Sequence, residues 1–199
     1  SHDSAAGTLR LRFPDGRELG GRVELGEPEQ VDMDGRPLAA RPVAGELSAA
    51  LSDHCGLPLR LFAAPADGEA LDRGPEGAVT LLSVASLERL RAEAGATEPV
   101  DPRRFRMTFG VTGLGAHDED AWIDRDVRVG GARVRVSGNV GRCALTTRNA
   151  DTGVVDSKTL HHLAAYRREV ETTEPLPFGV YAHVVEPGRV RVGDPVLPA

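Results

Sequence analysis

The sequence contains little of the chemistry that stabilises small secreted or metal-dependent proteins. Its 199 residues include only two cysteines, Cys55 and Cys143, and neither belongs to a CxxC pair. This spacing excludes a zinc knot, an iron–sulfur cluster and a disulfide framework. The sequence leaves open a single bridge between the two thiols. Two free thiols in a reducing cytoplasm are the simpler expectation.

Aromatic residues and long apolar runs are also scarce. Aromatic residues make up 4% of the chain, and no apolar run approaches the roughly 20 residues that cross a bilayer as a helix. The first residues do not resemble a signal peptide. We therefore expect a cytoplasmic protein without a membrane segment.

Positive charge is in deficit. The formal net charge is −6 and the sequence pI is about 5.5. Binding to nucleic acid or to an anionic membrane requires a basic surface, so both classes of partner are disfavoured. Lys158 is the single lysine, so almost all of the positive charge is arginine, whose guanidinium suits phosphate groups.

Turn-forming residues, in contrast, are abundant. The 23 glycines and 14 prolines favour many short elements over a few long helices. Apolar alternation predicts strands, and apolar spacing of three to four residues predicts helices. The strands are expected at 9–13, 22–25, 57–62, 79–82, 103–109, 127–129, 134–136, 142–148, 178–185 and 189–196, and the helices at 43–55, 84–94 and 158–168. Residues 65–77 are expected to form a mobile or inter-domain loop, and the fold to be mainly β, of the α+β class.

Cys143 is the residue with the clearest chemistry. It stands between Arg142 and the pair Thr146 and Thr147, and cationic and hydroxyl groups stabilise a thiolate. A small buried hydrophobe on a strand is the alternative. Cys55 is expected to end a helix, where the dipole disfavours a thiolate, and we assign it a structural role.

Arginines are concentrated at residues 103–106. On the predicted strand, Arg104, Arg106 and Thr108 share one face, which is either solvated or an anion site. The acidic run from His117 to Asp120 is a poor metal site, because adjacent loop residues rarely converge, and we expect a turn before a core Trp122. His161 and His162 point to different faces of a helix and cannot bind one ion as a pair.

The second half of the chain resembles the MOSC domain, found in molybdenum cofactor sulfurases, the mitochondrial amidoxime reducing component and bacterial relatives. The resemblance extends from Arg103 to Val196 and follows a series of motifs in order. These are Arg104-Phe105-Arg106, Glu119-Asp120 with Trp122, Arg142-Cys143 with Leu145-Thr146-Thr147, Asp151-Thr152-Gly153-Val154, Leu160 and Leu163 with Tyr166-Arg167, Phe178-Gly179 with Tyr181, and Val192-Gly193-Asp194-Pro195-Val196.

This resemblance implies two domains. Residues 81–199 are expected to form a MOSC β-barrel with two or three helices outside it. Residues 1–80 resemble the latter part of the β-rich domain that precedes MOSC in the amidoxime-reductase branch. The opening strand of that domain, with its Tyr-Pro-Val-Lys-Ser type motif, has no counterpart here.

The resemblance also implies a site. The position of Cys143 is that of the thiolate ligand of molybdenum in the reductases, or of a persulfide carrier in sulfur-transfer members. Arg104 and Arg106 are then expected to bind the phosphate of the pterin cofactor, with Thr108, Arg142, Thr146 and Thr147 completing the set. The chain departs from the reductases at Met107-Thr108, where they usually have Pro-Asn, and at Gly141, where they often have Ser or Thr.

Three functions follow from the resemblance. The first is a molybdenum cofactor-dependent oxidoreductase that reduces N-hydroxylated small molecules with electrons from a partner, either a flavin reductase or a protein of the ferredoxin or cytochrome type. The second is a sulfurtransferase with a persulfide on Cys143 and a partner that donates sulfur. The third is a non-catalytic cofactor carrier, which the departures at Met107 and Thr108 and the missing strand favour modestly.

Overall fold

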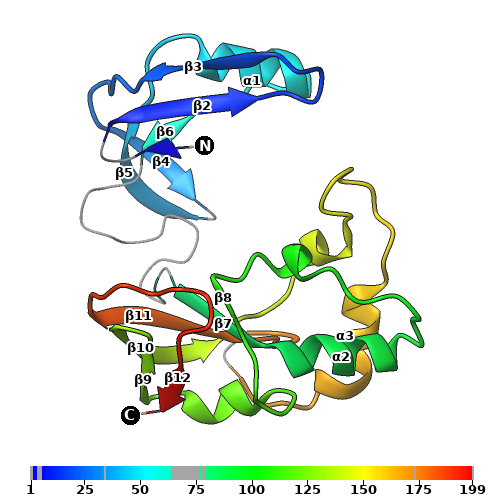
Figure 1. Ribbon diagram of the computed structural model, residues 1–199. Helices are drawn as coiled ribbons and strands as arrows, with labels where there is room; N and C mark the ends of the chain where they lie inside the picture. The colour runs from blue at the N-terminus through cyan, green and yellow to red at the C-terminus, as the bar shows by residue number, and fades with distance from the viewer. Residues whose placement is uncertain are drawn as a thin grey trace. The chain divides into compact units, whose positions relative to one another are not determined.

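The computed structural model describes residues 2–3, 6–33, 35–63, 77, 79–172 and 174–198 (Figure 1). The chain divides into two compact units, residues 1–74 and 75–199. The loop predicted at residues 65–77 lies outside the described residues except for Gly77. Each unit has its own sheets.

The described residues of the first unit form two three-stranded antiparallel sheets and one helix. Strands β1 (His2–Asp3), β2 (Thr8–Arg12) and β3 (Glu18–Arg22) form one sheet, and β4 (Glu29–Met33), β5 (Arg36–Pro42) and β6 (Phe62–Ala63) form the other. The strand predicted at 9–13 and the helix α1 (Leu47–Cys55) are confirmed, with Gly56 ending the helix at a φ of 65°. The strand predicted at 22–25 is misplaced, because β2 pairs with Glu18–Arg22. The β4–β5 hairpin was missed, and the strand predicted at 57–62 is reduced to β6.

The second unit is built on a six-stranded mixed sheet. Its strands are β7 (Val79–Ser83), β8 (Phe109–Val111), β9 (Asp126–Val129), β10 (Ala132–Asn139), β11 (Val180–Glu186) and β12 (Val196–Pro198). They lie in the order β12-β9-β10-β11-β7-β8, and only the β7–β8 pair is parallel.

One face of this sheet encloses a core. Val111 of β8, at one edge, packs in the same cluster as Val127, Val134 and Val180 from the central strands. Val196 of β12, at the opposite edge, packs against that cluster too. Since both edge strands contact one core, the sheet curls into a nearly closed barrel, which confirms the predicted mainly β, α+β fold.

Helices cover the other face. These are α2 (Val84–Glu93) and α3 (Thr159–Arg167), which lie beside each other (Figure 1), with the 3-10 turns η1 (Pro102–Phe105) and η3 (Ala144–Thr147). The 3-10 turn η2 (Asp118–Trp122) instead contributes Trp122 to the core cluster of the first face. The second core cluster lies between the helices and the sheet and consists of Leu82, Leu87, Leu90, Phe105, Leu163 and Phe178. None of the helices in the described part of the chain has the length and apolar character needed to cross a membrane.

The strand predicted at residues 103–109 is wrong over most of its length. Asp101 accepts a hydrogen bond from the backbone N–H of Arg103 at 2.9 Å and caps η1, which begins with Pro102. Arg106 then adopts a left-handed conformation with φ 52°, and strand β8 starts only at Phe109. The alternation of apolar residues therefore does not place the arginines on one face of a sheet.

The strand predicted around Cys143 is also wrong. The chain leaves the sheet after Asn139, and Cys143 precedes η3 in an extended conformation. The strand predicted at residues 189–196 is wrong over most of its length, because residues 189–192 form no strand. Strand β12 begins only at Val196 and pairs with β9, Val196 opposite Val129.

Candidate functional site

Cys143 lies at the start of η3, and its side chain is exposed. It is a free thiol, as is Cys55 in the first unit, which is exposed as well. The alternative of a buried hydrophobe on a strand does not apply to Cys143. An exposed thiol held on a short turn is accessible to a metal, a cofactor or a sulfur donor.

The two threonines after Cys143 build the turn that presents it. The Thr146 hydroxyl donates to the Cys143 carbonyl at 3.0 Å, and the Thr147 hydroxyl donates to the Ala144 carbonyl at 2.6 Å. Thr146 is buried, and its own carbonyl accepts a hydrogen bond from the Thr159 hydroxyl of α3. Both hydroxyls are thus used in backbone contacts that position Cys143.

Arg142 has its guanidinium directed at backbone groups of the protein. Its Nε donates to the Phe178 carbonyl at 3.0 Å, and its Nη1 donates to the Phe105 carbonyl at 3.1 Å. Its Nη2 lies 2.8 Å from the Met107 sulfur. The side chain therefore ties η1 to the entry of β11, a structural role that the local sequence did not indicate.

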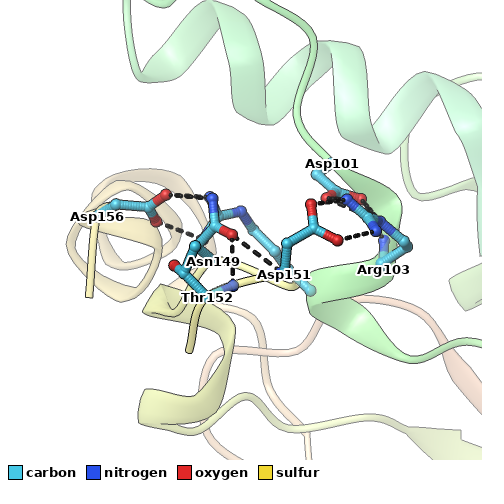
Figure 2. Close-up of polar contacts among 7 residues, drawn as sticks. Asp101, Arg103, Asn149, Asp151, Thr152 and Asp156 are labelled. Atoms are coloured by element: carbon cyan, nitrogen blue, oxygen red, sulfur yellow. Dashed lines mark hydrogen bonds and ion pairs between the residues drawn. The ribbon is translucent and has the colours of Figure 1, made fainter. Parts of the chain in front are cut away.

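Two arginines of η1 are paired with aspartates of the loop that follows η3. Arg103 forms ion pairs with Asp101 at 2.8 Å and with Asp151 at 2.7 Å, and Figure 2 shows both carboxylates directed at it. Arg104 pairs with Asp156 at 2.7 Å. The Arg103 guanidinium lowers the pKa of Asp151. The Arg104 guanidinium, followed by the Asn149 amide, lowers the pKa of Asp156 to about 2.

Asn149 organises this loop from within. Its side-chain oxygen accepts from the backbone N–H groups of Asp151 and Thr152 at 2.9 and 3.0 Å, and its amide donates to Asp156 (Figure 2). Such a turn is typical of asparagine. Nothing in the sequence indicated that the aspartates of this loop would pair with η1.

A pocket of about 420 Å³ opens between η1 and this loop. It is lined by Arg103, Arg104, Arg106 and Arg148, with the half-exposed apolar side chain of Leu145 beside them. Arg148 donates to the Gly153 carbonyl at 2.8 Å. Arg106 is exposed, and no residue in the described ranges forms a hydrogen bond or ion pair with its side chain. The pocket is therefore a cationic site with one uncommitted guanidinium.

The structure brings some of the predicted site residues together and not others. Arg104 and Arg106 line the pocket, and Cys143 is two residues from Leu145 on its wall. Thr108 exchanges hydrogen bonds with Thr80 and so joins β8 to β7. Arg148 is a pocket residue that sequence reasoning missed. The cofactor contacts expected of Arg104, Arg106, Thr108, Arg142, Thr146 and Thr147 stay predictions.

Comparison with known proteins decides the family. The MOSC domain model matches residues 69–197, about two thirds of the chain. This chain belongs to the MOSC domain family. The matching model does not cover residues 1–68, so their assignment to a partial amino-terminal MOSC domain stays a prediction, as does the boundary at residue 80.

The named relatives of this MOSC chain are amidoxime reducing components. The mitochondrial amidoxime-reducing component 1 of Xenopus laevis is 38% identical over 125 residues, which are 59% of this chain and 35% of the relative. The mitochondrial amidoxime reducing component 2 of Homo sapiens is 41% identical over 99 residues, 46% of this chain and 29% of the relative. The chain thus spans about a third of the length of the curated relatives it matches.

Solved structures add little to this assignment. The crystal structure of YiiM from Geobacillus stearothermophilus aligns with a TM-score of 0.47 and 14% identity, covering 89% of this chain and 73% of that one. A similarity of this size supports no argument about function.

The MOSC unit also buries several polar groups away from the pocket. Glu119 is fully buried, with the Ser86 hydroxyl 3.4 Å from one of its oxygens. Burial raises its pKa. His117, whose ring lies 5.6 Å from those of Tyr166 and Phe178, has no hydrogen-bond partner on either ring nitrogen within the described residues. Burial, followed by the charge of Arg167, lowers the pKa of His117 to about 4.

His117 should make the MOSC unit less stable in mild acid. The unfolded histidine binds a proton near pH 6.5 and the folded one near pH 4, so the free energy of unfolding falls as the pH drops from about 6.5 to 4. The expected loss is about 2 kcal/mol, discounted for partial exposure. Denaturant unfolding at several pH values, followed by the fluorescence of the buried Trp122, measures it.

The His117→Asn variant isolates this effect. Asparagine tolerates the left-handed backbone of residue 117, whose φ is 66°. Glu119, whose raised pKa gives the opposite pH dependence, is present in both proteins, so the difference between variant and parent belongs to His117. The matched change at the exposed His161 should leave the decline intact. A parallel decline in parent and His117→Asn would refute the assignment.

Proposed function

We propose that this MOSC chain binds the molybdenum cofactor and takes part in the reduction of N-hydroxylated small molecules. The observation that supports the proposal is the exposed thiol of Cys143. Cys143 directly precedes the turn η3, and Leu145 of that turn lines the cationic pocket. A thiolate is a soft ligand suited to transition metals, and guanidinium groups suit a phosphate. The residues present therefore fit a metal-pterin cofactor with a phosphate.

The roles of the residues follow from their contacts. Cys143 would hold the metal. Arg106, which has no partner within the described residues, would bind the cofactor phosphate together with Arg148. Arg104 would support the phosphate with the N–H groups that its pair with Asp156 leaves free. Thr146, Thr147 and Arg142 act through the backbone, since they hold η3 and the loop before it in place.

The cofactor supplies the redox chemistry when it is bound. Reduction of an amidoxime to an amidine breaks one N–O bond, consumes two electrons and two protons, and releases water. We propose that the electrons come from a dissociable donor protein of the flavin reductase, ferredoxin or cytochrome type. In this proposal the chain works in the cytoplasm.

Molybdenum analysis tests the proposal directly. Full-length protein expressed in a host that makes the cofactor should contain close to one molybdenum per chain, and Cys143→Ala protein should contain essentially none. Arg106→Gln should lower the content of the pterin as well as that of the metal. Metal that persists in Cys143→Ala would refute the assignment of Cys143 as the ligand.

Sulfur transfer is a second candidate function, because the Cys143 thiol is exposed and could carry a persulfide. In that case intact-mass spectrometry of protein isolated without reductant should show one added sulfur atom on Cys143 and none on Cys55, although both thiols are exposed. Neither metal nor added sulfur on Cys143, with a pterin retained, would instead support a non-catalytic carrier.

A further inference from the structure

Arg106 lines a second pocket in the MOSC unit, of about 370 Å³. Arg103 and Arg106 border both this pocket and the cationic one, so the two adjoin at η1. The remaining walls of the second pocket are apolar. They consist of Leu82, Val84, Leu87, Pro102, Met107 and Gly110. We call it the apolar pocket.

The walls of the apolar pocket are rigid on one side and open on the other. Leu82 and Leu87 are 3% and 8% exposed and belong to the core cluster that also contains Phe105. Val84, the first residue of α2, is 37% exposed although it is apolar. A preformed concave surface of this volume is in the range of small-molecule sites, roughly 300–1,000 Å³.

The two arginines that border the apolar pocket differ in their ion pairs. Arg103 is neutralised by Asp101 and Asp151. Arg106 has no such partner within the described residues. The backbone of Arg106 is fixed by a hydrogen bond from its main-chain N–H to the Arg103 carbonyl, at 3.2 Å. The residue has a left-handed conformation, with a φ of 52°. The apolar pocket therefore ends at a single uncompensated cation.

We propose that the apolar pocket and Arg106 form a binding site for a small organic acid. The aryl or alkyl body of the acid lies against Val84, Met107 and Gly110, and its carboxylate pairs with the Arg106 guanidinium. Burial of the apolar body supplies affinity, and the planar fork of the guanidinium selects a carboxylate over a neutral group. This site goes beyond the proposed function, since it needs neither a metal nor the Cys143 thiol. It shares Arg106 with the proposed phosphate contact, so its test uses protein from a host that does not make the molybdenum cofactor.

Binding of 3-phenylpropionate to the purified full chain, measured by calorimetry, tests the proposal. Two probes serve as controls: 3-phenylpropionamide has the same body without the charge, and acetate has the charge without the body. We expect the acid to bind at least about tenfold more tightly than the amide, in line with a charge-assisted hydrogen bond, and acetate to show no measurable binding.

Matched variants separate the two parts of the site. Arg106→Gln should lower the affinity for 3-phenylpropionate to that for 3-phenylpropionamide. Arg128→Gln, which removes the same charge from an exposed residue of β9 outside both pockets, should change nothing. Gly110→Leu should block the acid and the amide alike. A Cβ at Gly110 would meet only the Val84 Cγ2, at 3.6 Å, so a side chain can start at this wall position without a backbone clash.

A second variant covers the case in which Gly110→Leu does not fold. Val84→Asp places a carboxylate on the pocket wall at the first position of α2, where a negative charge favours the helix. It should weaken the acid more than the amide.

Several results would overturn the site. These are equal affinities of acid and amide for the parent protein, an unchanged preference in Arg106→Gln, or unchanged binding in Gly110→Leu and Val84→Asp. Cys143→Ala protein should bind the acid as the parent does. The organic-acid site and the proposed molybdenum chemistry can therefore fail independently.

Discussion

Cys143→Ala should abolish amidoxime reduction while leaving the protein folded. The metal would lose its only proposed protein ligand, so the rate should fall to that of cofactor-free protein. The thiol is exposed and forms no hydrogen bond within the described residues, so the free energy of unfolding should change by about 0.5 kcal/mol or less. Benzamidoxime reduction with a chemically reduced viologen measures the rate without a partner protein.

Cys55→Ala is the matched control, because it removes the other exposed thiol, at the end of α1 in the first unit. It should keep the full rate and the full molybdenum content. If both alanine variants retained activity, the thiol would not be the metal ligand. If metal-loaded parent protein were inactive towards amidoximes and hydroxylamines, the reductase proposal would fail.

Arg142→Ala should destabilise the MOSC unit by about 3 kcal/mol. The substitution leaves the carbonyls of Phe105 and Phe178 without their charged donor and removes the contact to the Met107 sulfur. Arg106→Ala, in contrast, removes an exposed side chain without a partner in the described part of the chain and should cost about 0.5 kcal/mol or less. Denaturant unfolding followed by Trp122 fluorescence reports on this unit, since Trp122 is buried in its core.

The pair of variants distinguishes a structural arginine from a binding arginine. Arg142→Lys should recover only part of the lost stability, because an ammonium group cannot reach two carbonyls with the geometry of a guanidinium. Arg106→Ala should lower cofactor content at nearly unchanged stability. Unchanged stability of Arg142→Ala, combined with loss of molybdenum, would instead assign Arg142 to the cofactor.

Much of the fold could be predicted from apolar periodicity. Strands β7, β9, β10 and β11 and helices α2 and α3 appear where the pattern places them. The errors occur where a local turn competes with the pattern. At residues 103–108 the alternation is that of a strand, but the Asp101 cap and Pro102 start η1, and the left-handed Arg106 ends it. After Cys143 the threonine hydroxyls stabilise a turn instead of a strand.

The site could be predicted only in outline. Cys143 was singled out from its neighbours, and the structure exposes it. The arginines were predicted as a group, yet Arg103 and Arg104 are paired with aspartates. The residues from His117 to Asp120 were expected to form a turn before a core Trp122, and they do, but Glu119 in that turn is itself fully buried. The spacing of residues along the sequence predicts which apolar side chains are buried, but it does not predict which polar side chains are buried.

By itself the sequence determined most of the secondary-structure pattern, the α+β class, the motifs of the MOSC family and the choice of Cys143 as the candidate functional cysteine. Only the tertiary structure decided which guanidinium groups bind carboxylates or carbonyls of the protein, and which one has no partner among the described residues. The partners of these groups are distant in sequence, Asp156 lying 52 residues from Arg104 and Phe178 lying 36 residues from Arg142. Charge neutralisation depends on distance in space, so chain folding selects Arg106 as the uncompensated cation that borders both pockets.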